Sequence, residues 1–312
     1  LDLSERVAPA ARPGHAPPIA ARPKHFSVTE IEILRRDPYA IYARRVLGLS
    51  PLEPLLRDPE AAERGRLLHA IIEKFDGVRP DETRQAALSR LLETGAAVFS
   101  DAALPGDVHA VWWPRFAAMA PEFIQWDQAR REGVLRSLAE VQSAKVQIGA
   151  TGVTLAGRAD RIDLLAGDEA DILDFKTGSS PSKKQAHTLL APQLALEGAL
   201  LARGAFAEAG NRTPHDLAHV RLKAKGEVTE ESILVIGRRE SVKSGPEISE
   251  EAWSHLEKLV ASFADPAQGY RSRVLPFRER EMDGDYDHLA RVLEWSSGSD
   301  GEQGEDDGED EA

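Results

Sequence analysis

Asp160, Asp174 and Lys176 are the residues whose types and spacing most directly predict chemistry in this sequence. They lie in the segments Gly157-Arg-Ala-Asp-Arg-Ile-Asp163 and Ile172-Leu-Asp-Phe-Lys-Thr-Gly178. Residues two apart on a β-strand point to the same face, so Asp174 and Lys176 share a face while Phe175 turns toward the core. Two carboxylates beside an ammonium can hold a divalent cation and a water next to a phosphate. The pattern therefore predicts metal-assisted cleavage of a phosphodiester.

The elements that must position these residues follow from the hydrophobic periodicity of the chain. Strand-like alternation covers residues 137–148, 153–165 and 171–175, and further strands are predicted at 218–223 and 232–236. Helical patterns cover residues 27–46 with a break at Asp37-Pro38, and then 59–75, 82–99, 108–128, 184–203 and 246–264. Three consecutive strands before a helix indicate an α/β fold with a mixed sheet, not a doubly wound one.

The bulk composition limits the class of protein. The 312 residues include no cysteine, so we expect no disulfide, no thiolate zinc site and no iron–sulfur cluster. No long apolar run and no signal peptide occur, so we expect a cytoplasmic protein without a membrane partner. The chain begins with Leu1 rather than Met, which suggests the back end of a longer polypeptide.

The net charge of −13 at first argues against a polyanionic partner. Residues 300–312, however, hold eight acidic residues and no basic one. Local basic patches matter more for contact with DNA than the total charge does. The candidate patches are Arg35-Arg36, Arg44-Arg45, Lys183-Lys184, residues 221–225 and residues 271–273.

Four pieces of the sequence, in this order, resemble the nuclease domain of the RecB-like branch of the PD-(D/E)XK superfamily. They are Gly65-Arg-Leu-Leu-His69, the segment around Asp160, Asp174-Phe-Lys-Thr-Gly178 and Gln193-Leu-Ala-Leu. The closest resemblance is to the C-terminal nuclease domain of AddB-type double-strand-break repair proteins, in its cysteine-free form. It implies a restriction-endonuclease-like mixed β-sheet core flanked by helices, with an N-terminal helical region.

The resemblance also implies a set of metal ligands. Asp160 and Asp174 would be carboxylate ligands of Mg²⁺ or Mn²⁺, ions that prefer hard oxygen donors. The backbone carbonyl of Phe175 would be a further ligand, and His69 would complete the shell from its helix. A histidine amid apolar residues can also be a plain core residue, and Asp174 with Lys176 can also form an ordinary salt bridge on a strand.

Catalytic roles are implied in the same way. Lys176 would orient or deprotonate the attacking water and offset the charge that builds on the phosphate. Gln193 would position the substrate or Lys176, although it could equally cap or pack its helix. Glu140, on the first strand, would support the ligands from behind, and Asp163 should face away from Asp160 and pair with an arginine.

The function implied is a magnesium-dependent deoxyribonuclease, of the exonuclease type found in helicase–nuclease complexes that act in double-strand-break repair and recombination. Its partners would be DNA, single-stranded at the site, and an AddA-like helicase subunit. One alternative is a non-catalytic scaffold that kept the nuclease fold and binds DNA or the helicase. The other is a stand-alone RecB-like exonuclease.

The sequence departs from the family pattern at two places. Many relatives have a tyrosine where this chain has Glu197. Many AddB-type proteins also clamp the domain with four cysteines, whereas here Asp37 stands near the expected first one. The clamp should therefore be ordinary packing between residues 27–49 and 286–295.

The expected organisation has three parts. Residues 1–24 form a disordered linker rich in proline and alanine, and residues 297–312 form a disordered acidic tail. Residues 25–296 form the nuclease domain, with a helical part at 25–135, a catalytic α/β core at 136–265 and a closing segment at 266–296.

Two further patterns are discounted. Residues 283–294 resemble an EF-hand loop, but His288 stands where the sharp turn needs glycine. His215-Asp-Leu-Ala-His219 resembles a zinc protease helix, but aspartate replaces the glutamate base and the stretch reads as a loop leading into a strand.

Overall fold

The computed structural model describes residues 11–51, 61–178, 180–188, 190–223, 226–234, 243–275 and 284–296 of the chain. The acidic tail at 297–312 and the first ten residues lie outside this range, as does the start of the EF-hand-like loop. No helix in the described part of the chain is both long enough and apolar enough to cross a membrane.

The centre of the molecule is a five-stranded mixed sheet with the strand order β3-β6-β7-β8-β9. Its strands are β3 (Arg136–Gln142), β6 (Arg158–Leu164), β7 (Glu169–Lys176), β8 (Thr213–Leu222) and β9 (Val228–Ser232). β7 and β8 run parallel, and the other neighbours are antiparallel. The mixed α/β fold predicted from the order of the elements is therefore confirmed.

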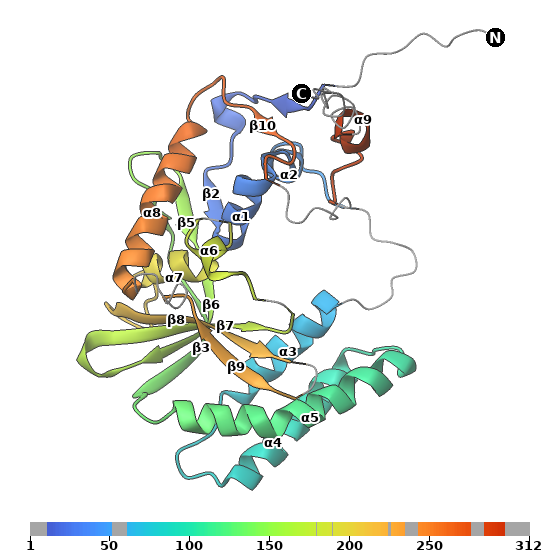
Figure 1. The fold of residues 1–312 in the computed structure, drawn as a ribbon, viewed down its shortest axis with the longest axis vertical. Helices are drawn as coiled ribbons and strands as arrows, with labels where there is room; N and C mark the ends of the chain where they lie inside the picture. The colour runs from blue at the N-terminus through green and yellow to red at the C-terminus, as the bar shows by residue number, and fades with distance from the viewer. Residues whose placement is uncertain are drawn as a thin grey trace, which may run out of the picture.

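Helices cover both faces of this sheet (Figure 1). On one side lie α3 (Ala61–Phe75), α4 (Arg84–Asp101) and α5 (Gly106–Arg130), and on the other α7 (Gln193–Ala202) and α8 (Gly245–Ser262). Side chains along β7 alternate between the two faces of the sheet. Leu173 and Phe175 pack with α3–α5, whereas Ile172 packs with α7 and α8. Asp174 and Lys176 share the face of Ile172, toward α7.

Two small sheets join the N-terminal segment to the rest. β2 (His25–Ser27) pairs with β5 (Thr154–Ala156), which pairs with β4 (Val146–Gln147). β1 (Gly14–His15) pairs with β10 (Tyr270–Arg271). Arg22 is 5% exposed, and its guanidinium donates to the carbonyls of Phe263 and Asp265. Residues 11–24 are thus part of the folded body, which corrects the expectation of a disordered linker there.

The N-terminal helices begin where the sequence predicts. Ser27 accepts from the Glu30 amide and the Glu30 side chain accepts from the Ser27 amide, which caps α1 (Val28–Arg36). After Asp37 the chain continues as α2 (Pro38–Ile41) and a π-helical turn, Tyr42–Val46.

The C-terminal segment packs on these helices, as expected for a clamp without cysteines. Tyr39 and Ala43 form a buried cluster with Tyr286, Ala290 and Val292. The short helix α9 (Val292–Ser296) begins at Val292, a member of this cluster.

Three predicted elements are wrong in extent. The helix expected at 184–203 is two helices, α6 (Lys183–Ala186) and α7, because Pro192 lacks an amide hydrogen and disfavours helical backbone before it. The strand expected at 153–165 is divided at Gly157, where the chain passes from one sheet to another. Of the strand expected at 232–236, residues 235 and 236 lie outside the described residues. The described strand, β9, starts earlier, after a tight turn at Gly226 whose φ is 93°, and it ends at Ser232.

Candidate functional site

β6 and β7 bring the two predicted aspartates to one end of the central sheet. Asp160 Oδ2 accepts a hydrogen bond of 2.8 Å from the backbone amide of Phe175, so the two strands are joined at the predicted site. Lys176 Nζ lies 2.8 Å from each carboxylate oxygen of Asp174. The structure thus brings together both acids and the amine that the sequence pattern linked.

His69 reaches this end of the sheet from α3. Its Nε2 lies 2.9 Å from the carbonyl oxygen of Phe175, and its Nδ1 lies 3.5 Å from Asp160 Oδ2. A separation of 2.9 Å suits a hydrogen bond, and it also suits two adjacent ligands of one ion, which lie roughly 3 Å apart when each is about 2.1 Å from the metal. His69 thus presents Nε2 to the Phe175 carbonyl and Nδ1 to Asp160, and it can bind a given ion through only one of these nitrogens.

α3 approaches the end of β7 closely because it has a glycine there. A Cβ atom at Gly65 would lie 3.3 Å from Thr177 Oγ1. His69 is one helical turn further along the same face, so this close approach sets the position of its ring.

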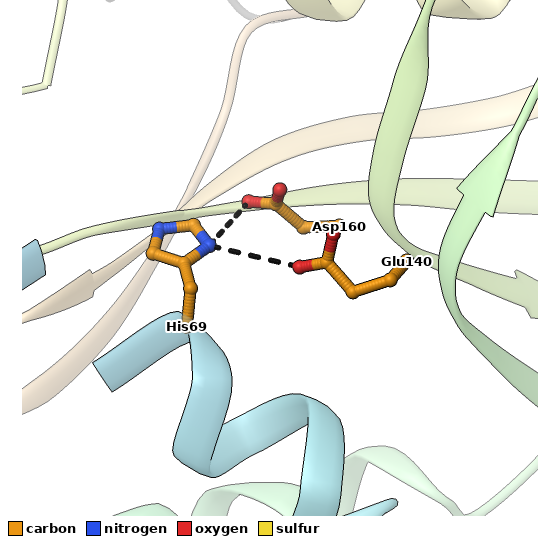
Figure 2. A group of neighbouring side chains, drawn as sticks. All are labelled: His69, Glu140 and Asp160. Atoms are coloured by element: carbon orange, nitrogen blue, oxygen red, sulfur yellow. Dashed lines mark ion pairs between the residues drawn. The ribbon is translucent and has the colours of Figure 1, made fainter. Parts of the chain in front are cut away.

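Glu140 belongs to the same group. The β3–β6 register, with Ala139 opposite Arg161 and Val141 opposite Ala159, places Glu140 opposite Asp160. Its Oε1 lies 4.0 Å from His69 Nδ1, as Figure 2 shows. The residue has a φ of 50°, a left-handed conformation that is uncommon for a non-glycine residue and is often found at functional sites.

Of the described residues, His69, Glu140 and Asp160 form the group of potential ligands whose donor atoms all lie within 4.8 Å of one another. They open onto a cavity of about 430 Å³ that is also lined by Arg66 and Arg158. Arg158 Nε lies 2.9 Å from Glu140 Oε2. The cavity therefore combines anionic metal-binding groups with cationic side chains that suit a phosphate.

Asp174 is the predicted ligand that stands apart from this group. It is 1% exposed, and its Oδ2 lies 2.9 Å from Nδ1 of His219 on β8. On the side of α7, Lys176 Nζ also donates to Gln193 Oε1 over 3.3 Å. Asp174, Lys176, Gln193 and His219 thus form a second, more buried cluster, joined to the first through the backbone of Phe175.

The two aspartates have opposite electrostatic surroundings. Burial and then the charge of Asp174 raise the pKa of Asp160 to about 7, although the Phe175 amide and Lys176 oppose this shift. Burial alone would raise the pKa of Asp174, but the hydrogen bond from His219 and the charge of Lys176 outweigh it, so that this pKa is lowered. Asp174 is therefore ionised at neutral pH, and Asp160 is poised to titrate there.

The neighbouring groups respond to these charges. Burial would lower the pKa of Lys176, but the charge of Asp174 raises it above its ordinary value, so the side chain is an ammonium. Burial and then Asp160 raise the pKa of Glu140. Burial, Asp174 and Asp160 together raise the pKa of Glu197 well above its usual range. A neutral Glu197 carboxyl can donate a hydrogen bond, as the tyrosine expected at this position could.

These residues fit a hard divalent cation. One imidazole and two carboxylates face an open cavity, and burial and then the charge of a neighbouring carboxylate raise the pKa values of Glu140 and Asp160, although nearby cationic side chains partly oppose these shifts. A divalent cation would supply that charge and would favour the ionised carboxylates.

The opposite face of β6 carries a separate set of charges. Asp163 Oδ1 accepts from Arg161 Nε over 2.7 Å, and its Oδ2 accepts from Arg130 Nε over 2.8 Å. The prediction that Asp163 faces away from Asp160 and pairs with arginine is confirmed. This network attaches α5 to the sheet and leaves Asp160 to the other face.

A sequence-family model that matches most of the chain shows which family the chain belongs to. The model described as PD-(D/E)XK nuclease superfamily matches residues 25–281. The chain belongs to the PD-(D/E)XK nuclease superfamily. Its mixed sheet with flanking helices is the restriction-endonuclease-like arrangement expected from the sequence. Nucleases of the PD-(D/E)XK superfamily use divalent metal ions, which agrees with the donor set around Asp160.

Curated relatives of this PD-(D/E)XK chain include uncharacterized proteins of Rickettsia. That of Rickettsia typhi is 30% identical over 192 residues, which is 59% of this chain and 22% of the relative. That of Rickettsia felis is 28% identical over 209 residues, which is 65% of this chain and 24% of the relative. The chain thus spans less than a quarter of the length of these relatives.

Solved structures give only a weak likeness. A crystal structure from Eubacterium rectale that carries an exonuclease designation covers 85% of this chain and 91% of its own, with 11% identity and a TM-score of 0.46. The structure of SSO0001 has a TM-score of 0.29 at 14% identity, and it covers 78% of this chain and 87% of its own.

Sequence reasoning missed His219 and gave Glu140 only a supporting place. The one available signal for His219 was a lone polar side chain inside the apolar run Leu217-Ala-His-Val220. In the structure the whole of His215–His219 lies on β8. The two histidines are therefore not on a helix, and the resemblance to a zinc protease helix does not hold.

Proposed function

We propose that this chain is a Mg²⁺-dependent DNA nuclease domain. The observation that carries this proposal is the meeting of His69, Glu140 and Asp160 at one open cavity, with the buried Asp174 and its partner Lys176 joined to this group through the backbone of Phe175. Superfamily membership supports phosphodiester cleavage as the reaction. The paired arginines at the cavity, Arg66 and Arg158, support an anionic polymer as the substrate.

In this proposal His69, Asp160, Asp174 and the Phe175 carbonyl hold Mg²⁺ or Mn²⁺, and Glu140 supplies a further carboxylate. The chemistry that the bound ion contributes is polarisation of the scissile phosphate and activation of a water. Lys176 is held as an ammonium by Asp174, so it stabilises negative charge that develops on the phosphate. Gln193 fixes the position of Lys176 through the 3.3 Å contact.

The wider assignment is an AddB-type nuclease domain that acts in a helicase–nuclease complex during double-strand-break repair and recombination. The AddB-like order of His69, Asp160, Asp174-Phe-Lys176 and Gln193 supports it, as does the greater length of the relatives. The substrate at the site would be single-stranded DNA, and the partner would be an AddA-like helicase. Residues 25–296 would be the nuclease unit, with residues 11–24 bound to it.

The test is cleavage of a labelled single-stranded oligonucleotide by the purified chain with and without Mg²⁺. Asp174→Asn keeps the shape of the side chain and removes its charge, and Lys176→Ala removes the ammonium. Each change should reduce the cleavage rate by about 100-fold or more, because charge stabilisation at the reacting phosphate is lost. Retained cleavage in both variants contradicts the assignment.

Two variants serve as matched controls. Asp168→Asn changes an aspartate whose side chain is 90% exposed, and Lys258→Ala changes an exposed lysine on α8 that belongs to none of the candidate basic patches. Both should cleave like the wild type.

Wild-type chain that binds the oligonucleotide but cleaves nothing at any Mg²⁺ concentration would favour the non-catalytic scaffold. Efficient cleavage by the chain alone, unaffected by a helicase partner, would favour the stand-alone exonuclease. Calorimetric titration with Mg²⁺ separates a scaffold that has lost its ion from a nuclease that lacks its partner.

A further inference from the structure

We propose that His219 is a positioning residue that sets the orientation of the Asp174 carboxylate for metal binding. This inference rests on the proposed function, and it adds to it a residue that the sequence pattern of the family did not point to. His219 acts through Asp174 and has no assigned contact with substrate.

The parallel pairing of β7 and β8 creates the contact. The register places Asp174 opposite His219, although the two residues are 45 positions apart in the chain. His219 is 3% exposed and Asp174 is 1% exposed, so water does not compete for the bond between Nδ1 and Oδ2, which measures 2.9 Å. In this pair Nδ1–H is the donor, because an ionised carboxylate can only accept.

The contact restricts how Asp174 can turn. Lys176 Nζ lies 2.8 Å from both carboxylate oxygens, and a point charge of this kind tolerates rotation of the carboxylate. The planar imidazole is fixed within a strand and directs its donor at Oδ2 alone. His219 therefore distinguishes the two oxygens of Asp174, because Oδ2 contacts both His219 and Lys176 whereas Oδ1 contacts Lys176.

Removal of a hydrogen bond to a metal-ligating side chain changes metal affinity by a known amount. Loss of such an outer partner lowers metal affinity or activity by about 10- to 100-fold in metalloproteins. Simple packing would require no particular donor position on residue 219, and this difference makes the inference testable.

The experiment compares two amides that place their donor differently. In His219→Asn the amide nitrogen can occupy the position of Nδ1, whereas in His219→Gln it lies one bond further out, near the position of Nε2. Mn²⁺ affinity of the metal-free chain is measured by calorimetry, and folding is followed by thermal melting. H219N should bind Mn²⁺ within about 3-fold of the wild type, and H219Q should bind it about 10- to 100-fold more weakly.

A double-mutant cycle separates positioning from a merely structural role. In an Asp174→Ala background, H219Q should change Mn²⁺ affinity by less than about 2-fold, because no carboxylate remains to be oriented. If melting shows that H219Q has lost its fold, His219→Leu replaces it as the variant of similar size without a donor.

Equal Mn²⁺ affinity in wild type, H219N and H219Q overturns the inference, and so does equal weakening in H219N and H219Q. An undiminished effect of H219Q in the Asp174→Ala background also overturns it. Wild-type chain that binds Mn²⁺ but does not cleave DNA overturns the proposed function alone, because the affinity comparison still tests His219. Wild-type chain that binds no Mn²⁺ overturns both.

Discussion

At the scale of single residues, the charge of an ionised Asp160 reduces the free energy of unfolding. This carboxyl group is buried beside Asp174, and its pKa of about 7 lies above the ordinary value of 3.8. Between these two pH values the folded chain binds more protons than the unfolded chain does. The free energy of unfolding therefore falls as pH rises through this interval, and the full penalty is present above pH 7.

Asp160→Asn should consequently stabilise the metal-free protein. The amide keeps an oxygen that can accept from the Phe175 amide, but it carries no charge. We expect an increase in the free energy of unfolding of about 1–3 kcal/mol at pH 8 in EDTA, which shrinks toward pH 4. Urea denaturation at both pH values measures it.

The exposed Asp168→Asn is again the control and should change neither value. A loss of stability in Asp160→Asn that is equal at pH 4 and pH 8 would show that the charge of Asp160 is not the source of the cost.

At the scale of elements, the position of α7 decides whether Gln193 meets Lys176. α7 packs against both β8 and α8, and Gly198 faces a side chain from each of them. A Cβ atom there would lie 2.3 Å from Ser249 Oγ and 3.2 Å from a methyl group of Leu217. A glycine inside a helix is otherwise unfavourable, so close packing is the reason for this one.

Gly198→Ala should therefore destabilise the protein, although alanine is the better helix former by about 1 kcal/mol. Overpacking should reduce the free energy of unfolding by about 1–3 kcal/mol, measured by urea denaturation. Because α7 must shift, cleavage that depends on Gln193 should also fall.

Gly106→Ala, at the start of α5, is the matched control, because a Cβ atom there would meet nothing within 4 Å. It should be neutral or slightly stabilising. Equal effects of the two substitutions would show that the contact of α7 with α8 is not tight.

At the scale of the whole molecule, residues from both ends of the described chain form one small core. Tyr39 and Ala43 are buried against Tyr286, Ala290 and Val292, and the Tyr286 hydroxyl donates to the Leu49 carbonyl over 2.8 Å. This packing takes the place that the resemblance gives to a cysteine clamp. It is distant in sequence from β6 and β7, which carry the proposed site, so the two regions should be separable in their local stability.

Tyr286→Ala should loosen this cluster and leave the site intact. Amide hydrogen exchange should accelerate in residues 38–46 and 270–275, and it should change little in β6 and β7, when followed by mass spectrometry. Leu289→Ala, in the same turn but 41% exposed, is the control and should leave exchange unchanged. Faster exchange in β7 would instead show that the clamp and the strands of the proposed site unfold together as one cooperative unit.

The sequence by itself determined what depends on local periodicity. Alternation along β7 placed Asp174 and Lys176 on one face and Phe175 on the other, and the same rule separated Asp160 from Asp163. The capping box at Ser27 fixed the start of α1. The order of strands and helices was enough to predict a mixed α/β sheet, because each element expresses its own hydrophobic period.

The tertiary structure decided what depends on pairing between distant strands. His219 meets Asp174 only because β8 lies parallel to β7 in one register, and that register shifts between Ala170 and Ile172. Glu140 joins His69 and Asp160 only through the pairing of β3 with β6 and a left-handed backbone at its own position. Such contacts are set by the packing of the whole core, because a strand that slips by one residue would turn these side chains to the other face.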